Sequence, residues 1–142
     1  MESPSLPSTL FPRRTWRWLF LAYVTLLTIG LLWPKLQIPA VMPRPDLVVH
    51  YVSFGLFTLL LCLWNPARTP RLGVNLLVAF AAGAAYGGAT ELLQAIPILN
   101  RSAGWDDWGA DVLGVGCGLL AYLAMRKLVR SHSAATPRRA DT

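Results

Sequence analysis

The chain has 142 residues, of which 54% are hydrophobic and only 14% are charged, and its mean hydropathy is +0.45. Soluble domains carry about 25% charged residues, so this composition excludes an ordinary soluble protein and indicates a single-domain membrane protein. The net charge of +6 does not point to nucleic acid, because the basic residues stand between apolar runs rather than on one motif. Cys62 and Cys117 each lie inside an apolar run, and we interpret both as small core residues rather than as metal ligands or a disulfide.

Four apolar stretches are long enough to cross a bilayer, which takes about 20 residues. All six tryptophans lie at or next to the ends of these stretches, where the indole ring is buried while its N–H reaches water. We therefore predict an all-α four-helix membrane bundle. It comprises a flexible segment at 1–12, a membrane domain at 13–130 with spans at 16–33, 47–64, 72–96 and 108–125, and a flexible basic tail at 131–142.

The 13 lysine and arginine residues are distributed unevenly over the flanks and loops. Ten lie at the N-terminal flank of the first span (counting Arg17 at its start), between the second and third spans, and after the fourth, whereas three lie in the other two loops. Cytoplasmic loops carry the excess of basic residues, so we predict that both termini are cytoplasmic and that loops 34–46 and 97–107 face outward. A cleaved signal peptide is the alternative for the first stretch, and it is disfavoured because no small-x-small site follows residue 33.

Ionisable side chains gather at the predicted outer ends of the second, third and fourth spans, where each needs a partner or a function. On each helix they share one face, because they recur at helical spacing. The pairs Gly83/Gly87 and Gly114/Gly118 lie on the same faces and allow close packing, either within one bundle or in a homo-oligomer. We predict an outward-facing polar pocket lined by Asp46, His50, Glu91, Gln94, Arg101, Asp107 and Asp111.

Simpler roles are open to several of these residues. Asp46 and Asp107 begin predicted helices, where a carboxylate caps free N–H groups. Gln94 would hydrogen-bond between helices. Glu91 and Asp111 fit such roles least, because neither begins a predicted helix and both have apolar neighbours. Arg101 and His50 also have simpler alternatives: Arg101 would neutralise a neighbouring acid, and His50 would be a hydrogen-bonded packing residue.

Three motifs follow one another between residues 45 and 118: Asp46, His50 and Tyr51; then Glu91 and Gln94; then Arg101, Asp107 and Gly114. In this order they resemble the VanZ-like family of small bacterial membrane proteins, named for a protein associated with resistance to the glycopeptide teicoplanin. Leu47 and Asp111 depart from the family pattern, which usually has Lys and Asn at these positions. The resemblance implies an envelope role in the bacterial cytoplasmic membrane and does not define a reaction.

Three functions fit such a pocket. We favour a non-enzymatic protein that binds an amphiphile, such as a glycopeptide's lipid tail or a lipid-linked cell-wall precursor, and so affects glycopeptide or envelope-stress tolerance. In it, Arg101 would pair with a phosphate or carboxylate. The alternative is an intramembrane hydrolase or transferase acting on a lipid-linked phosphate or sugar, with His50 as acid or base oriented by Asp46. Glu91 or Asp111 would then hold a divalent metal. A proton path is disfavoured, because the cytoplasmic half lacks a charged relay.

Overall fold

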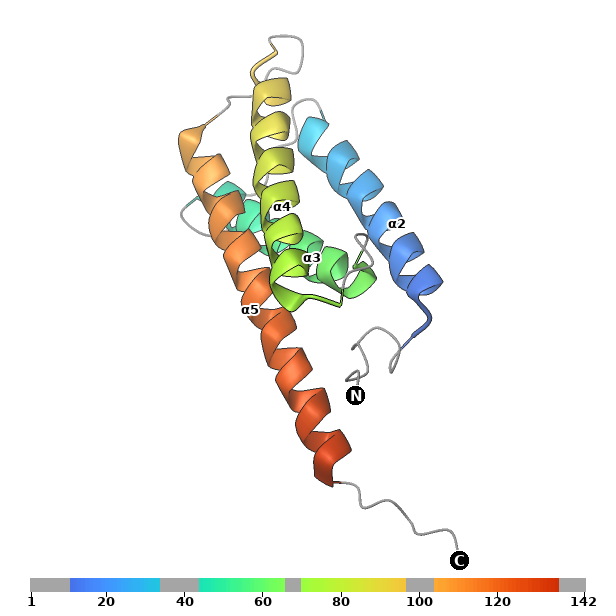
Figure 1. The fold of residues 1–142 in the computed structure, drawn as a ribbon. Helices are drawn as coiled ribbons and strands as arrows, with labels where there is room; N and C mark the ends of the chain where they lie inside the picture. Colours follow the sequence, from blue (N-terminus) through green and yellow to red (C-terminus); the bar gives the residue numbers. More distant parts are fainter. Residues whose placement is uncertain (1–10, 34–43, 66–69, 97–103, 136–142) are drawn as a thin grey trace, which may run out of the picture.

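The computed structural model describes residues 11–33, 44–65, 70–96 and 104–135, with the backbone alone for 133–135 (Figure 1). These residues form four helices, each long and apolar enough to cross a membrane. The predicted all-helical class and the four candidate spans are confirmed, and this is the architecture of a multi-pass membrane protein. The helices are α2 (Arg13–Leu32), α3 (Pro45–Trp64), α4 (Leu72–Gln94) and α5 (Trp105–Ala135).

Helix α5 differs most from its predicted bounds, because we expected it to cover residues 108–125 and a flexible tail to begin at 131. The sequence between residues 119 and 135 contains neither proline nor glycine and is rich in Ala, Leu, Met, Arg and Lys, all of which favour a helix. The helix therefore continues to Ala135. At about 1.5 Å per residue, its 31 residues span about 46 Å, and Figure 1 shows its C-terminal part running beyond the other helices.

Side chains connect the helices at both ends of the bundle. At the end of the bundle where α2 begins and α3 ends, Arg13 on α2 donates to the carbonyl oxygens of Trp64 and Asn65, at 3.0 and 2.7 Å. These carbonyls lie at the C-terminal end of α3, where no following helical turn donates N–H groups to them. At the opposite end, the Gln94 amide on α4 donates to the Leu31 carbonyl oxygen of α2, at 2.8 Å. The Arg13 bonds join α2 to the end of α3, and the Gln94 bond joins α4 to α2. Hydrogen bonds between helices therefore stabilise the bundle at both ends.

Helices α3 and α5 pack most closely, and glycines make this possible. A Cβ atom at Gly114 would overlap the Tyr51 carbonyl oxygen, and one at Gly118 would overlap the Gly55 carbonyl oxygen. A Cβ atom at Gly83 on α4 would lie 2.6 Å from a methyl carbon of Val115. The small-residue faces predicted from the sequence are therefore occupied by packing within one chain.

Aromatic rings fill the centre of the bundle. Phe54, Phe57 and Tyr86 lie in mutual contact, and the Phe57 and Tyr86 rings are parallel with centroids 5.1 Å apart. Large apolar side chains cover the outside, which suits contact with lipid. Of the two cysteines, Cys62 is buried as predicted, whereas the prediction for Cys117 is wrong, because Cys117 is exposed; neither cysteine forms a disulfide.

Candidate functional site

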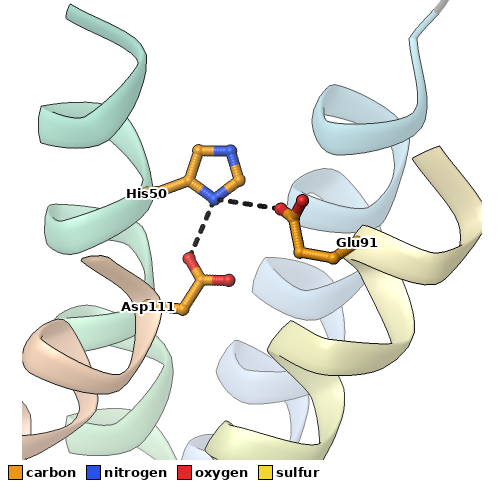
Figure 2. A group of neighbouring side chains, drawn as sticks. All are labelled: His50, Glu91 and Asp111. Atoms are coloured by element: carbon orange, nitrogen blue, oxygen red, sulfur yellow. Dashed lines mark hydrogen bonds and ion pairs between the residues drawn. The ribbon is translucent and has the colours of Figure 1, made fainter. Parts of the chain in front are cut away.

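Three helices bring His50 of α3, Glu91 of α4 and Asp111 of α5 together, as Figure 2 shows. We call these three residues the HED cluster. The His50 Nδ1 atom lies 2.8 Å from Asp111 Oδ1 and 4.0 Å from Glu91 Oε1. All three residues are buried, with exposed fractions of 2% for His50, 7% for Glu91 and 0% for Asp111. Ionisable groups from three separate spans thus converge on one point inside the bundle.

Glycines on two helices make room for the cluster. Gly87 lies one turn before Glu91, and a Cβ atom there would come within 2.8 Å of Asp111 Oδ2. Gly114 lies one turn after Asp111 and lets the α5 backbone touch α3 at Tyr51. The side chain of Asp111 therefore reaches the space between α3 and α4 because small residues flank it.

Two oxygen atoms of the cluster have no hydrogen-bond partner among the described residues: Glu91 Oε1 and Asp111 Oδ2. The other Glu91 oxygen, Oε2, accepts the backbone N–H of Gly104 at 3.0 Å. A buried carboxylate oxygen without a partner is costly in a medium of low dielectric constant. The cluster therefore has unused capacity to accept a proton, a hydrogen-bond donor or a cation.

The other two acidic residues predicted to line the pocket, Asp46 and Asp107, lie beside the HED cluster and not in it. We expected Asp46 to orient His50, whereas the structure gives that position to Asp111, because α5 packs directly against α3. Asp107, one turn before Asp111, is half-buried, and its Oδ1 atom has no hydrogen-bond partner among the described residues. Asp107 therefore adds negative charge beside the cluster, and Asp46 is half-buried in the first turn of α3.

Two further residues were predicted to line the pocket, Gln94 and Arg101. Gln94 is directed at the Leu31 carbonyl oxygen, so it serves the interhelical hydrogen bond that was the alternative to ligand contact. Arg101 lies outside the described residues.

An exposed ion pair lies at the same end of the bundle and was not expected from the sequence. The Arg44 guanidinium donates to Asp106 Oδ2 at 2.9 Å, and this hydrogen bond raises the pKa of Arg44. The side chain of Asp106 is 64% exposed, so this ion pair lies at the surface. The two residues are 62 positions apart, so no local pattern could have indicated the pairing.

An apolar groove of about 620 Å³ lies between the first turns of α3 and α5. The α3 side is formed by Leu47, Val48 and Tyr51, and the α5 side includes Trp108 and Leu113. Asp106 also lines it, so the groove combines an apolar floor with a charged residue that is paired with Arg44. Such a surface suits the apolar part of an amphiphile.

Within the part of the chain that the structure describes, no second group of three His, Cys, Asp or Glu side chains lies close enough to share an ion. Comparison with protein-family models gives no match for this chain, and comparisons with curated proteins and with solved structures also give none. The chemistry of the HED cluster is therefore the basis for a functional assignment.

Proposed function

We propose that this chain is a multi-pass protein of the bacterial cytoplasmic membrane that binds the polar head group of an amphiphile at the outer surface. The observation that carries the proposal is the HED cluster, whose buried carboxylates keep two oxygens free of hydrogen bonds among the described residues. The uneven distribution of basic residues supports cytoplasmic termini, which would direct this end of the bundle outward.

The depth of the cluster supports a head-group ligand. His50 lies five residues after the start of α3, Asp111 six residues after the start of α5, and Glu91 three residues before the end of α4. At about 1.5 Å per residue, each lies within about 10 Å of its helix end. In a bilayer this is the level just below the head groups, so a polar group could enter while its apolar chain stays in lipid.

The charge of the cluster favours particular ligands. Two or three carboxylates beside one histidine attract ammonium groups, hydroxyl donors or a cation and repel a bare anion. A lipid-carrying glycopeptide and the sugar of a lipid-linked cell-wall precursor both present such donors. The apolar chain of either would occupy the groove between α3 and α5. Arg101, proposed as the partner for a phosphate or carboxylate, enters from the sequence alone.

The proposal includes membership of the VanZ-like family and a role in glycopeptide or envelope-stress tolerance. Its support is the order of the three motifs in the sequence, together with the fact that His50 of the first motif and Glu91 of the second both belong to the HED cluster. The third member, Asp111, stands where the family usually has Asn, so it supports the cluster and not the family assignment.

The test combines binding with tolerance in cells. Purified protein in lipid nanodiscs is titrated with teicoplanin, with a glycopeptide that lacks an acyl chain, and with a lipid-linked precursor. We expect saturable binding of at least one acylated ligand and its loss in Glu91→Gln and His50→Ala. His132→Ala is the matched histidine control, because His132 is exposed near the C-terminal end of α5, outside the cluster and the groove. A deletion strain complemented with the same variants, at equal membrane levels, should lose tolerance with the first two variants only. Wild-type binding and tolerance in both variants would refute the proposal.

A hydrolase or transferase acting on a lipid-linked phosphate or sugar is the second candidate, and one observation favours it. The 2.8 Å contact from Asp111 Oδ1 to His50 Nδ1 fixes the imidazole ring and leaves Nε2 as the nitrogen that exchanges a proton. Purified protein is assayed for phosphate or sugar release from prenyl-linked substrates, with and without divalent metals. Turnover that disappears in His50→Ala would support this candidate, and absence of turnover under all these conditions would exclude it for these substrates.

A further inference from the structure

We propose that His50, Glu91 and Asp111 bind one divalent transition-metal ion, with Zn²⁺ and Mn²⁺ as the best-fitting members of that class. This inference deepens the proposed function, because it depends on the same three side chains and states what the cluster holds before the head group arrives. The ligands are His50 Nδ1, Glu91 Oε1 and a carboxylate oxygen of Asp111.

The separations between these atoms suit a shared ion. A metal bound at about 2.0–2.2 Å from each ligand places neighbouring ligand atoms about 3–4 Å apart. The His50 nitrogen lies 2.8 Å from the Asp111 oxygen and 4.0 Å from the Glu91 oxygen, and all three donors lie within 4.8 Å of one another. Figure 2 shows both carboxylates turned toward the ring nitrogen, so only small side-chain rotations are needed.

The buried charge supports a cation independently of this spacing. Glu91 Oε1 and Asp111 Oδ2 lack hydrogen-bond partners among the described residues, although Glu91 is 7% exposed and Asp111 is 0% exposed. Two carboxylates against a single imidazole leave negative charge uncompensated in a medium of low dielectric constant. One ion of charge +2 balances both carboxylates and satisfies both oxygens.

Neighbouring groups hold the ligands in place. The Gly104 N–H donates a hydrogen bond to Glu91 Oε2, and this leaves Glu91 Oε1 directed at His50. The Phe54 ring is parallel to the imidazole within 3°, with centroids 6.5 Å apart. Such contacts around a metal ligand fix its orientation and raise the affinity of the site.

The types of ligand select the class of metal. One imidazole nitrogen with two carboxylates suits Zn²⁺, Mn²⁺ or Fe²⁺, whereas soft ions prefer thiolates. Cys62 and Cys117 are not part of the group. Three protein ligands also leave at least one coordination position for water or an incoming group. A phosphate or hydroxyl of the head group could take that position, so a metal would allow an acidic cluster to bind an anionic ligand.

The test measures metal binding to the full-length protein in detergent or nanodiscs, without an amphiphile. After chelator treatment and dialysis, the protein is titrated with Zn²⁺, Mn²⁺ and Mg²⁺ by calorimetry, and bound metal is counted by mass spectrometry. We expect one Zn²⁺ or Mn²⁺ per chain and weaker binding of Mg²⁺. Glu91→Gln and Asp111→Asn should lower the affinity by more than about 100-fold, since loss of an outer-shell partner alone costs about 10–100-fold. His132→Ala, at the exposed C-terminal part of α5, should bind metal like the wild type.

The outcomes are distinct. Absence of saturable binding to the wild type, or equal binding in the wild type and both cluster variants, overturns the inference. Should the variants fail to fold, electron spin-echo spectra of Mn²⁺ bound to the wild type decide instead. Modulation from a coordinated imidazole nitrogen supports the site, and its absence overturns it.

Repeating the amphiphile titration with and without chelator separates the two proposals. Amphiphile binding to protein that takes up no metal would refute this inference alone. Metal binding without any amphiphile binding would refute the proposed function alone.

Discussion

The two ends of the bundle use buried polar groups in opposite ways. At the end where α2 begins and α3 ends, Arg13 donates to the last carbonyls of α3, and the Asn75 amide donates to the Cys62 carbonyl oxygen at 3.2 Å. These donors satisfy backbone acceptors and so stabilise the fold. Asn75 Oδ1 has no hydrogen-bond partner among the described residues, but it is a neutral amide oxygen, whereas the unsatisfied oxygens at the other end belong to the carboxyl groups of Glu91 and Asp111. This difference is what we expect if the first set serves stability and the second serves the proposed binding.

The largest effect is expected where the glycine contact between α3 and α5 is broken. Gly114→Val would place a side chain against the Tyr51 carbonyl oxygen, so the two helices must separate. We expect a loss of about 3 kcal/mol or more in the free energy of unfolding, at or beyond the upper range for overpacked cores. Gly116→Val is the matched control, because nothing lies within 4 Å of a Cβ atom there. Thermal unfolding in detergent measures both, and equal stability of the two variants would contradict the packing described.

At the end of the bundle where α2 begins and α3 ends, Arg13→Ala removes two hydrogen bonds that a charged side chain donates to the last carbonyls of α3. We expect the free energy of unfolding to fall by about 2 kcal/mol, since hydrogen bonds to charged groups contribute about 1.5–3 kcal/mol. Arg14→Ala is the control, because Arg14 is the exposed neighbour and removes the same charge. A similar change in both variants would assign the effect to charge or topology rather than to these bonds.

Neutral substitution of buried polar groups should change stability with opposite sign at the two ends. Glu91→Gln replaces a buried carboxylate with an amide that costs less to bury, so metal-free protein should gain about 1 kcal/mol. Asn75→Ala at the other end should lose about 1 kcal/mol, the net value of its hydrogen bond. Chemical unfolding of chelator-treated protein measures both. A loss of stability in Glu91→Gln would show that the carboxylate serves the fold.

The smallest effect is expected for the exposed pair at the cluster end. Arg44→Ala removes an ion pair whose side chains are 56% and 64% exposed, and such exposed pairs contribute little to stability because water and salt screen them. Asp106→Asn should have the same small effect on the thermal unfolding temperature, and high salt should reduce both. A clear drop in that temperature would mean that the pair holds the first turns of α3 and α5 together.

Much of the fold follows from the sequence because apolar runs of sufficient length must become helices in a bilayer. The main error in the helix bounds arose at Arg126, where we ended the span because charge begins there. Charge limits the hydrocarbon-embedded part of a helix, but it does not end the helix itself when no proline or glycine follows. Membrane depth and helix length are separate quantities, so the bounds of a span do not give the bounds of its helix.

The sequence predicted which face of each helix carries the site residues, but not how those faces meet. Helical periodicity placed His50, Glu91 and Asp111 on the inward faces of their helices, and all three are buried there. Periodicity within one helix does not fix the rotation or offset of a neighbouring helix. The choice between Asp46 and Asp111 as the histidine partner depends on that offset, which is set by glycine contacts such as that of Gly114 with α3.

The length of α5 ties the site to the thickness of the surrounding bilayer. Between Trp108 and Arg126 lie 18 residue steps, or about 27 Å of helix, close to the about 30 Å of a hydrocarbon core. In a membrane, the indole at one end and the guanidinium at the other hold this helix at a defined height, and Asp111 is carried on it. Lipids with longer chains would tilt α5 or draw it inward, and the distance from Asp111 to the water would change with them.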